Sequence, residues 1–134
     1  MQEHKDAKLI ILCADTPRGK IQHMVDKVAY NLDIPWLALG PYGHSKAFLG
    51  PLFLPKQTKS YSEIFSEADV IEDDRIIEIN NNFKASIIAP FNGLVAKMAT
   101  VEVLKFLTGY APVSIINTRL IVNTDTWLIE ERKY

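Results

Sequence analysis

Residues 8–32 read KLIILCADTPRGKIQHMVDKVAYNL, and this stretch decides the fold. Its apolar run, Leu9–Leu12, is typical of a strand that is buried on both faces in a parallel sheet. A helix is expected to follow at once, with Thr16 as its N-cap and Pro17 in its first position. Asp15 lies between the strand and the helix. Because ligands of open α/β sheets bind outside the carboxyl ends of parallel strands, Asp15 is the first candidate functional residue.

A second strand is expected directly after this helix. Asp33-Ile34-Pro35 ends the helix, since the residue before a proline avoids the α region. Trp36–Leu39 is then a short apolar strand, and strand, helix and strand together form a parallel βαβ unit. A further strand is predicted over Ala47–Leu54, antiparallel to its predecessor because only a short turn joins them. Pro51 within it indicates an edge strand or a bulge.

The second half of the chain is predicted to hold a long connection, a long helix and a hairpin. The connection, about residues 56–82, is rich in acidic residues. The helix begins between Ser86 and Pro90 and ends before Gly109, and it is apolar around most of its circumference. Such a helix is buried, or it is covered by another subunit. The hairpin is expected to pair residues 118–122 with residues 127–131.

These elements define the fold class. We expect an α/β protein with a Rossmann-like partial sheet, in which a parallel βαβ unit is joined by antiparallel strands and by a long buried or interface helix. The whole chain, residues 1–134, is expected to form a single domain, because 134 residues that are 48% hydrophobic can bury one sizeable core.

Composition narrows the classes of function. The net charge of −1 gives no basic surface that would favour nucleic acid. No apolar run approaches the roughly 20 residues that span a bilayer, so no membrane partner is expected. Cys13 is the single cysteine, which excludes a disulfide framework and fits a reducing, cytoplasmic location. At the end of a buried strand, Cys13 is expected to behave as an inert, small apolar residue.

Several common reaction motifs are absent from the sequence. The six glycines form neither GxGxxG nor GxxxxGK[ST], so no backbone cradle for phosphate is visible. None of the three histidines stands at metal-ligand spacing from the cysteine or from another histidine. His23 is expected at the surface of the first helix. His44, in the turn after the second strand, is either a surface residue or a group that reaches a ligand.

Asp15 has two interpretations from its chemistry alone. A carboxylate just beyond the carboxyl end of a strand can coordinate Mg²⁺ on a nucleotide, because Mg²⁺ is commonly held by one or two carboxylates and by phosphate oxygens. Alternatively, Asp15 is an ordinary aspartate beside the helix start, where it assists Thr16. The residues themselves leave both interpretations open.

Four segments of the chain resemble a known family. They are ADTPRGKIQHMVDKVAYNLDIPWLALG at 14–40, GPLFLP at 50–55, SIIAPFNGLVAKMATVEVLKFLTGYAP at 86–112 and INTRLIVNTDT at 116–126. In this order they are similar to the carboxyl-terminal half of ThiF/MoeB/HesA-type enzymes, which are bacterial relatives of ubiquitin-activating enzymes.

The resemblance implies an adenylyltransferase. Members of this family use ATP and Mg²⁺ to convert the carboxyl terminus of a small ubiquitin-like protein or peptide into an acyl-adenylate, usually as dimers. Asp15 matches the family's aspartate that contacts Mg²⁺ and ATP, and Lys20 lies where many members have an arginine. Residues 56–82 resemble the crossover loop that covers the substrate's tail. The long helix resembles one that packs near the dimer interface.

The chain also departs from the family. The glycine-rich, ATP-binding amino-terminal half is missing, and so are the zinc-binding CxxC pairs, of which the first would fall at Thr58–Ser62. No zinc is therefore expected. No catalytic residue is expected either, because the attacking carboxylate belongs to the substrate. We expect part of an adenylyltransferase, inactive as an isolated chain, that pairs with a second copy or with an amino-terminal half. The alternative is a catalytically inactive dimerisation or peptide-binding module.

Overall fold

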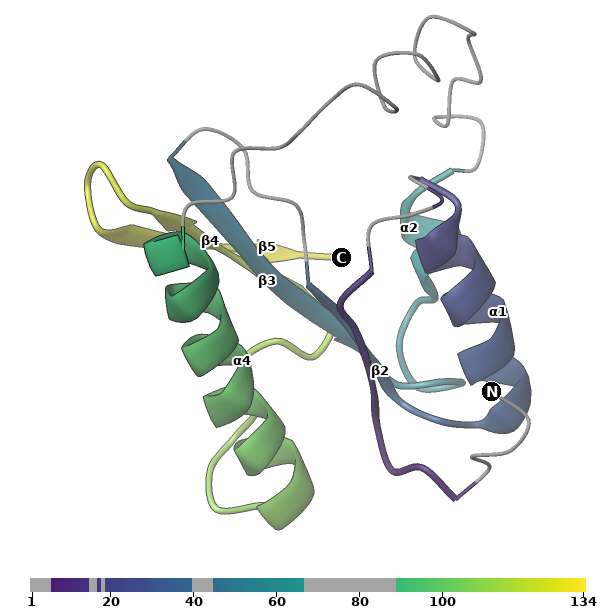
Figure 1. Cartoon of the computed structure of the whole chain (residues 1–134). Coiled ribbons are helices and arrows are strands. Elements are labelled where there is room, and N and C mark those ends of the chain that lie inside the picture. The colour runs from purple at the N-terminus through teal and green to yellow at the C-terminus, as the bar shows by residue number, and fades with distance from the viewer. Residues whose placement is uncertain (1–5, 15–16, 18, 40–44, 67–88) are drawn as a thin grey trace, which may run out of the picture.

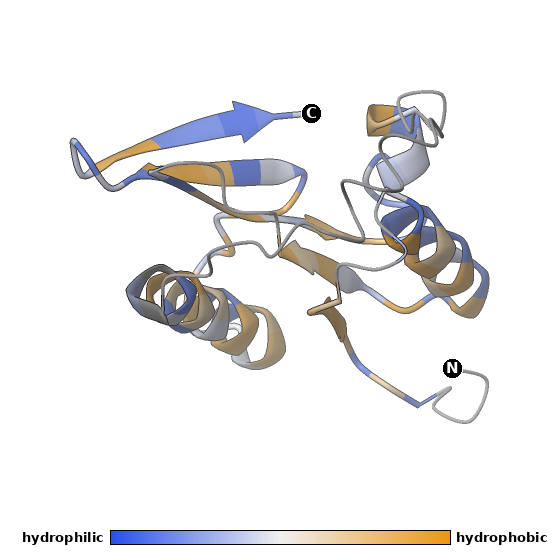
Figure 2. Cartoon of the chain, turned by 45° about the horizontal axis from the view of Figure 1, so that its top comes forward, coloured by the Kyte–Doolittle hydropathy of each residue, from blue (hydrophilic) through white to orange (hydrophobic). Residues whose placement is uncertain are grey.

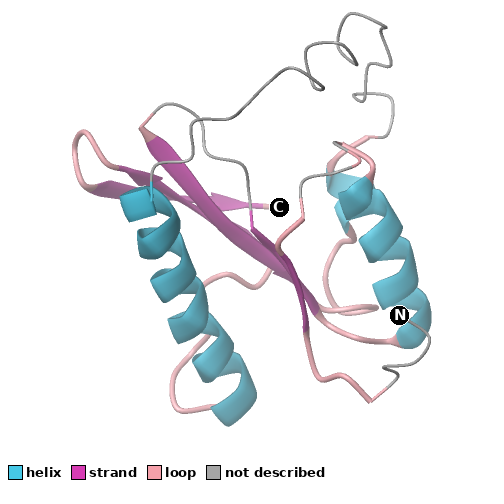
Figure 3. Ribbon diagram, viewed as in Figure 1, coloured by secondary structure: helices cyan, strands magenta, loops and turns pink. Residues whose placement is uncertain are grey.

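Five strands form one mixed sheet in the order β1-β2-β3-β4-β5. The computed structural model describes residues 6–14, 17, 19–39, 45–66 and 89–134. Figures 1 and 3 show α1 and α4 on opposite sides of the twisted sheet. Along the chain the elements are β1 Ile10–Leu12, α1 Ile21–Leu32, β2 Trp36–Leu39, β3 Lys46–Phe53, α2 Tyr61–Ile64, α4 Ala89–Thr108, β4 Thr118–Asn123 and β5 Leu128–Lys133.

The pairing of the strands confirms the predicted fold class. β1 and β2 are parallel, with Ile10 opposite Trp36, and α1 connects them. β2–β3, β3–β4 and β4–β5 are antiparallel. The predicted hairpin is β4–β5, in which Thr118 lies opposite Lys133 and Asn123 opposite Leu128.

The start of α1 differs from the prediction. The helix begins at Ile21 with Lys20 as its N-cap, and not at the predicted Pro17. Thr16 lies outside the described residues. The carbonyl of Pro17 accepts hydrogen bonds from the backbone N–H groups of Lys20 (3.1 Å) and Ile21 (2.9 Å). Gly19 has a φ of 75°, outside the right-handed helical region. The chain therefore turns once before the helix can start.

Each face of the sheet has its own core, and Figure 2 shows hydrophobic residues along both helices and the central strands of the sheet. On one face, α1 packs against the stacked rings of Trp36 and Phe53, whose centroids are 4.7 Å apart. On the other face, Val95 and Ala99 of α4 are buried against the sheet. The members of the second core are Leu37, Ala47, Leu49, Leu52, Val95, Ala99, Ile115, Leu120 and Val122.

β1 is less buried than predicted. Within the described residues its only neighbour is β2, so it is an edge strand and not one covered on both faces. Leu12 is 8% exposed, but Ile11 is 44% exposed. Cys13, expected to be an inert residue at the end of a buried strand, is exposed for the same reason.

β3 is a central strand despite its proline, so the edge alternative for Pro51 is wrong. The predicted irregularity is present, because the β2–β3 register shifts between Leu37 and Leu39. The ladder with β4 ends at Leu49, and beyond the proline the N–H of Leu52 donates to the carbonyl of Ile115 (2.8 Å). Since proline has no N–H to give, β3 changes its partner at this point.

α4 is buried on one side only. Its inner side belongs to the core, but Val101, Leu104 and Leu107 are 45%, 48% and 53% exposed. Gly109, with a φ of 68°, follows the helix as predicted, and its N–H donates to the carbonyl of Lys105 (2.8 Å). None of the described helices is long and apolar enough to cross a bilayer.

Candidate functional site

The predicted functional edge lies at the carboxyl end of β1. β1 ends at Leu12 and α1 begins at Ile21, so the connecting loop emerges where a parallel strand ends. Asp15 itself lies outside the described residues, and so does His44. Lys20 is described, and it lies with an exposed side chain at the first turn of α1.

The backbone at the start of α1 is already occupied. A helix N-terminus can bind an anion through its free N–H groups. Here the N–H groups of Lys20 and Ile21 donate to the carbonyl of Pro17, at 3.1 and 2.9 Å. These two donors do not form a phosphate cradle in the described structure. The Lys20 side chain remains as the nearby cation.

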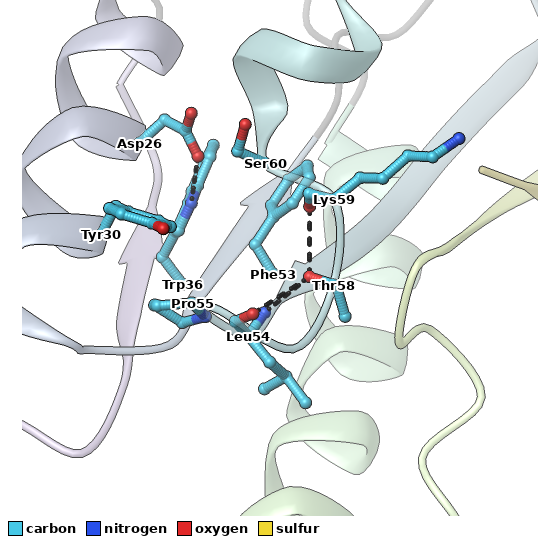
Figure 4. Close-up of a pocket in the computed structure, with 9 residues that line it drawn as sticks. All are labelled: Asp26, Tyr30, Trp36, Phe53, Leu54, Pro55, Thr58, Lys59 and Ser60. Atoms are coloured by element: carbon cyan, nitrogen blue, oxygen red, sulfur yellow. Dashed lines mark hydrogen bonds between the residues drawn. The ribbon is translucent and has the colours of Figure 1, made fainter.

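Among the described residues, the Asp26 carboxylate, which is 5% exposed, accepts four hydrogen bonds on this side of the sheet. Its Oδ1 accepts hydrogen bonds from Trp36 Nε1 (3.2 Å, dashed in Figure 4) and from the N–H of Tyr61 (3.0 Å). Its Oδ2 accepts bonds from the N–H (3.2 Å) and the Oγ (3.1 Å) of Ser62. Asp26 therefore joins α1 and β2 to α2, where the predicted crossover loop begins.

His23 belongs to the same network, and the prediction that it lies at the surface is wrong. The residue is 7% exposed, and its Nδ1 lies 3.0 Å from Ser62 Oγ. Because the Ser62 hydroxyl proton is donated to Asp26, the Nδ1–H of His23 is the donor in this contact. The ring also meets Tyr61 edge-on, at 4.9 Å between centroids.

Sequence reasoning missed the role of Asp26 entirely. The available signal was the spacing of His23 and Asp26, which places both on one face of a helix. A second signal was the serine-rich segment at Thr58–Ser62, whose hydroxyl and N–H groups need acceptors. Neither signal could identify the partner, because the contacts span 35–39 residues along the chain.

α2 begins with a complete capping box. The Ser60 Oγ accepts from the N–H of Glu63 (3.2 Å), and the Glu63 carboxylate accepts from the N–H of Ser60 (2.7 Å). These bonds to Ser60, the backbone bond first, hold the pKa of Glu63 below its ordinary value of 4.5. The start of the predicted crossover loop is therefore fixed by local bonds as well as by Asp26.

The capping box should make the stability of α2 depend on pH, because the Glu63 carboxylate must be ionised to accept its bond fully. A lowered pKa in the folded state means that the bond contributes fully above the unfolded pKa and is lost as the pH falls through the folded pKa. We expect the Glu63 carboxyl, followed by ¹³C NMR, to titrate below pH 4.5 and to move back toward this value in Ser60→Ala. An unchanged titration in that variant would contradict the capping geometry.

A small hollow of about 10 Å³, open to solvent, lies between α1, the end of β3 and the turn before α2 (Figure 4). Tyr30, Pro55 and Lys59 are among the residues that line it. Sites for drug-sized ligands usually enclose about 300–1,000 Å³. The hollow is therefore too small for a nucleotide. The residues that line it pack around Asp26 and do not form a binding pocket.

A second cluster, formed by Arg119, Phe65 and Tyr134, lies further along the same face of the sheet. The guanidinium carbon of Arg119 lies 4.9 Å from the ring centroid of Phe65 and 5.8 Å from that of Tyr134. Its Nε donates to the carbonyl of Gly50 at 3.3 Å. Burial raises the pKa of the neighbouring Tyr61, and the positive charge of Arg119 partly opposes this shift.

The chain belongs to the ThiF family, whose model matches residues 2–133. This confirms the resemblance to ThiF-type enzymes. Comparison with curated protein sequences gave no significant match.

Solved structures of MccB from E. coli are similar to the chain. The structure of MccB with ATP is 28% identical at a TM-score of 0.77, and the match covers 95% of this chain and 36% of that one. The microcin C7 biosynthetic enzyme MccB in complex with N-formylated MccA is 26% identical at a TM-score of 0.80, over 95% of this chain and 38% of that one. PaaA shares the fold, with a TM-score of 0.69 at 20% sequence identity. The match covers 96% of this chain and 42% of PaaA. The chain thus spans well under half the length of these proteins.

Proposed function

We propose that this chain is the carboxyl-terminal portion of an ATP-dependent adenylyltransferase that activates the carboxyl terminus of a small ubiquitin-like protein or a peptide. Membership of the ThiF family over residues 2–133 is the observation that carries the proposal. The similarity to MccB, which has been solved with ATP and with N-formylated MccA, supports both the nucleotide and the kind of substrate.

In this proposal the loop after β1 supplies part of the nucleotide site. The Asp15 carboxylate would hold Mg²⁺, a hard cation that favours carboxylate oxygens, and the Lys20 ammonium would contact phosphate oxygens. Mg·ATP supplies an activated α-phosphate, to which the substrate carboxylate becomes joined as pyrophosphate leaves. The described residues fit this role only in part, since the N–H groups of Lys20 and Ile21 are bonded within the chain.

The remaining part of the site would come from another polypeptide segment. We propose an amino-terminal ThiF half beside β1, and a second copy of the chain in the assembly. Two surfaces support such partners. Among the described strands β1 lies at the edge of the sheet, with Ile11 44% exposed, and the outer side of α4 exposes Val101, Leu104 and Leu107 at 45–53%. Apolar surface of this kind commonly marks an interface.

A catalytically inactive dimerisation or peptide-binding module is the second candidate. It is favoured by the internal bonding of the Lys20 and Ile21 N–H groups, which removes two backbone donors that a phosphate could use. Such a module would keep the sheet and the network around Asp26 and would bind its partner without ATP.

Calorimetry and pyrophosphate exchange separate the two candidates. Mg·ATP binding and ATP–pyrophosphate exchange are measured for the chain alone and after addition of an amino-terminal ThiF half. We expect activity only in the combined sample, and a loss of at least about tenfold in Asp15→Asn, since removing one charged ligand costs about 1.5–3 kcal/mol. Asp33→Asn, which changes an exposed carboxylate at the far end of α1, is the matched control.

Two outcomes would decide against the adenylyltransferase. The first is no ATP binding in either sample. The second is binding that Asp15→Asn leaves unchanged. Peptide binding combined with no ATP binding in either sample would favour the inactive module.

A further inference from the structure

Two arginines occupy opposite positions on the last two strands of the described sheet. Arg119 of β4 is directly opposite Arg132 of β5. Side chains opposed in this way share one face of the sheet, with Cβ atoms about 4.5–5.5 Å apart, and like charges in this arrangement destabilise the pair. Among the described residues, neither arginine forms an ion pair with a carboxylate. Glu130 lies two residues before Arg132 on the same face of β5, but no ion pair joins it to either arginine.

Aromatic rings hold the inner arginine in place. The guanidinium of Arg119 lies 4.9, 5.8 and 6.0 Å from the ring centroids of Phe65, Tyr134 and Phe48, and its Nε donates to the carbonyl of Gly50. In the same cluster the Tyr134 hydroxyl is buried and has no hydrogen-bond partner in the described part of the chain. The cluster thus combines a fixed cation with a buried hydroxyl that makes no bond.

This cluster is open at the edge of the sheet. All six residues of β5 are exposed, and Figure 2 shows most of this strand as hydrophilic. Arg119 lies on the face of the sheet that carries α2, because it contacts Phe65, the residue after that helix. The predicted crossover loop, which resembles a cover for the substrate's tail, continues from this point.

We propose that Arg119 and Arg132 together bind a carboxylate of the protein or peptide substrate, while the rings of Phe65 and Tyr134 contact an apolar side chain beside it. The inference rests on the proposed function for the identity of this partner. The planar guanidinium fork matches a carboxylate bidentately, and two forks on one face can share its two oxygens. A bound carboxylate also relieves the repulsion between the two arginines.

The sheet sets the spacing along the substrate. β4 lies three strands from β1, which corresponds to roughly 14 Å at about 4.8 Å per strand. An extended chain spans about 3.3–3.6 Å per residue. The recognised side chain therefore stands about four residues before the terminal carboxylate that is activated in the loop after β1. The substrate class is a tail with Asp or Glu near this position and an apolar residue next to it.

Peptides blocked at both ends test this inference. The probe is an N-acetylated, C-amidated peptide Gly-Phe-Asp-Gly-Gly-Gly, compared with its Asn counterpart and measured by calorimetry on the whole chain. We expect the Asp peptide to bind at least about fivefold more tightly, with a preference that falls as salt rises. Arg132→Gln should abolish the preference. Lys133→Gln, which removes the same charge from the other face of β5, should preserve it.

A second measurement tests the repulsion itself. Arg132→Glu should abolish binding of the Asp peptide and raise the melting temperature by about 1–4 °C, because an opposite-charge pair replaces a like-charge pair. A lower melting temperature would contradict the premise. Three binding results would contradict the proposal: equal binding of the Asp and Asn peptides, loss of the Asp preference in Lys133→Gln as well as in Arg132→Gln, and tighter binding of a phosphoserine peptide. The amidated probes cannot be adenylated, so failure of pyrophosphate exchange with retained binding overturns only the proposed function.

Discussion

Replacing Asp26 with alanine is expected to lower the free energy of unfolding by about 3–5 kcal/mol, because several hydrogen bonds to one carboxylate are lost and each contributes about 1.5–3 kcal/mol or less where water can replace it. The substitution leaves Trp36 Nε1, the N–H groups of Tyr61 and Ser62, and the Ser62 hydroxyl without their acceptor. Trp36 is 1% exposed, so its Nε1–H would find no water in place of the carboxylate. The effect is measured by urea denaturation of the whole chain.

Two further variants make this result specific. Asp26→Asn retains the size of the side chain and one acceptor oxygen, so we expect a smaller loss of about 1–3 kcal/mol. Asp33→Asn removes an exposed carboxylate that pairs with Lys56 at 3.3 Å, and it should change stability by less than about 1 kcal/mol. Hydrogen exchange at Tyr61 and Ser62 should accelerate in Asp26→Ala. A loss below 1 kcal/mol in that variant would show that the network does not secure α2.

Replacing Gly50 with alanine is the second large effect. An added Cβ at this position would lie 2.7 Å from the carbonyl oxygen of Thr118 and 3.2 Å from Ile115 Cβ. The backbone φ of 86° is also unfavourable for any residue with a side chain. Steric overlap and the backbone conformation together are expected to cost about 2–4 kcal/mol, measured as a shift of the unfolding midpoint in urea.

The matched control is another glycine in an ordinary helical position. A Cβ added at Gly93 of α4 meets nothing within 4 Å, so Gly93→Ala should stabilise the chain by about 0.5–1 kcal/mol. Opposite signs for the two alanine variants are the expected pattern. Equal effects would indicate that the close approach of β3 to β4 is not as described.

Local patterns in the sequence were sufficient to predict most elements. The helical spacing of apolar residues predicted α1 and α4, and Gly109 marked the end of α4. The two short turns predicted antiparallel neighbours at β2–β3 and β4–β5. The boundary of α1 was wrong by several residues, because the turn at Gly19 competes with the proline as a helix start.

What the sequence could not predict depends on distant neighbours. Leu9–Leu12 has the composition of a fully buried strand, yet Ile11 is exposed because one side of β1 has no described neighbour. From the sequence, Glu102 is expected among the exposed polar residues of α4. It is buried, however, since its carboxylate accepts from the N–H of Ser114 (2.7 Å) and pairs with Lys105. The predicted roles of Asp15 and Lys20 in binding Mg·ATP remain predictions.

The position of β4 beside β3 has a consequence for how the chain acquires its structure and how it can change over evolution. These strands are neighbours in the sheet, yet residues 54–117 separate them in the sequence. Contacts close in sequence make up two parts of the sheet, which are β1–α1–β2–β3 and the β4–β5 hairpin. Because local contacts form faster than distant ones, these two parts are expected to form first, and the pairing of β3 with β4 is expected to be the slow step. Closing a loop twice as long would cost only about 0.6 kcal/mol more. Insertions between α2 and α4 would therefore carry little thermodynamic penalty, whereas α4 itself is fixed by Val95 and Ala99 in the core.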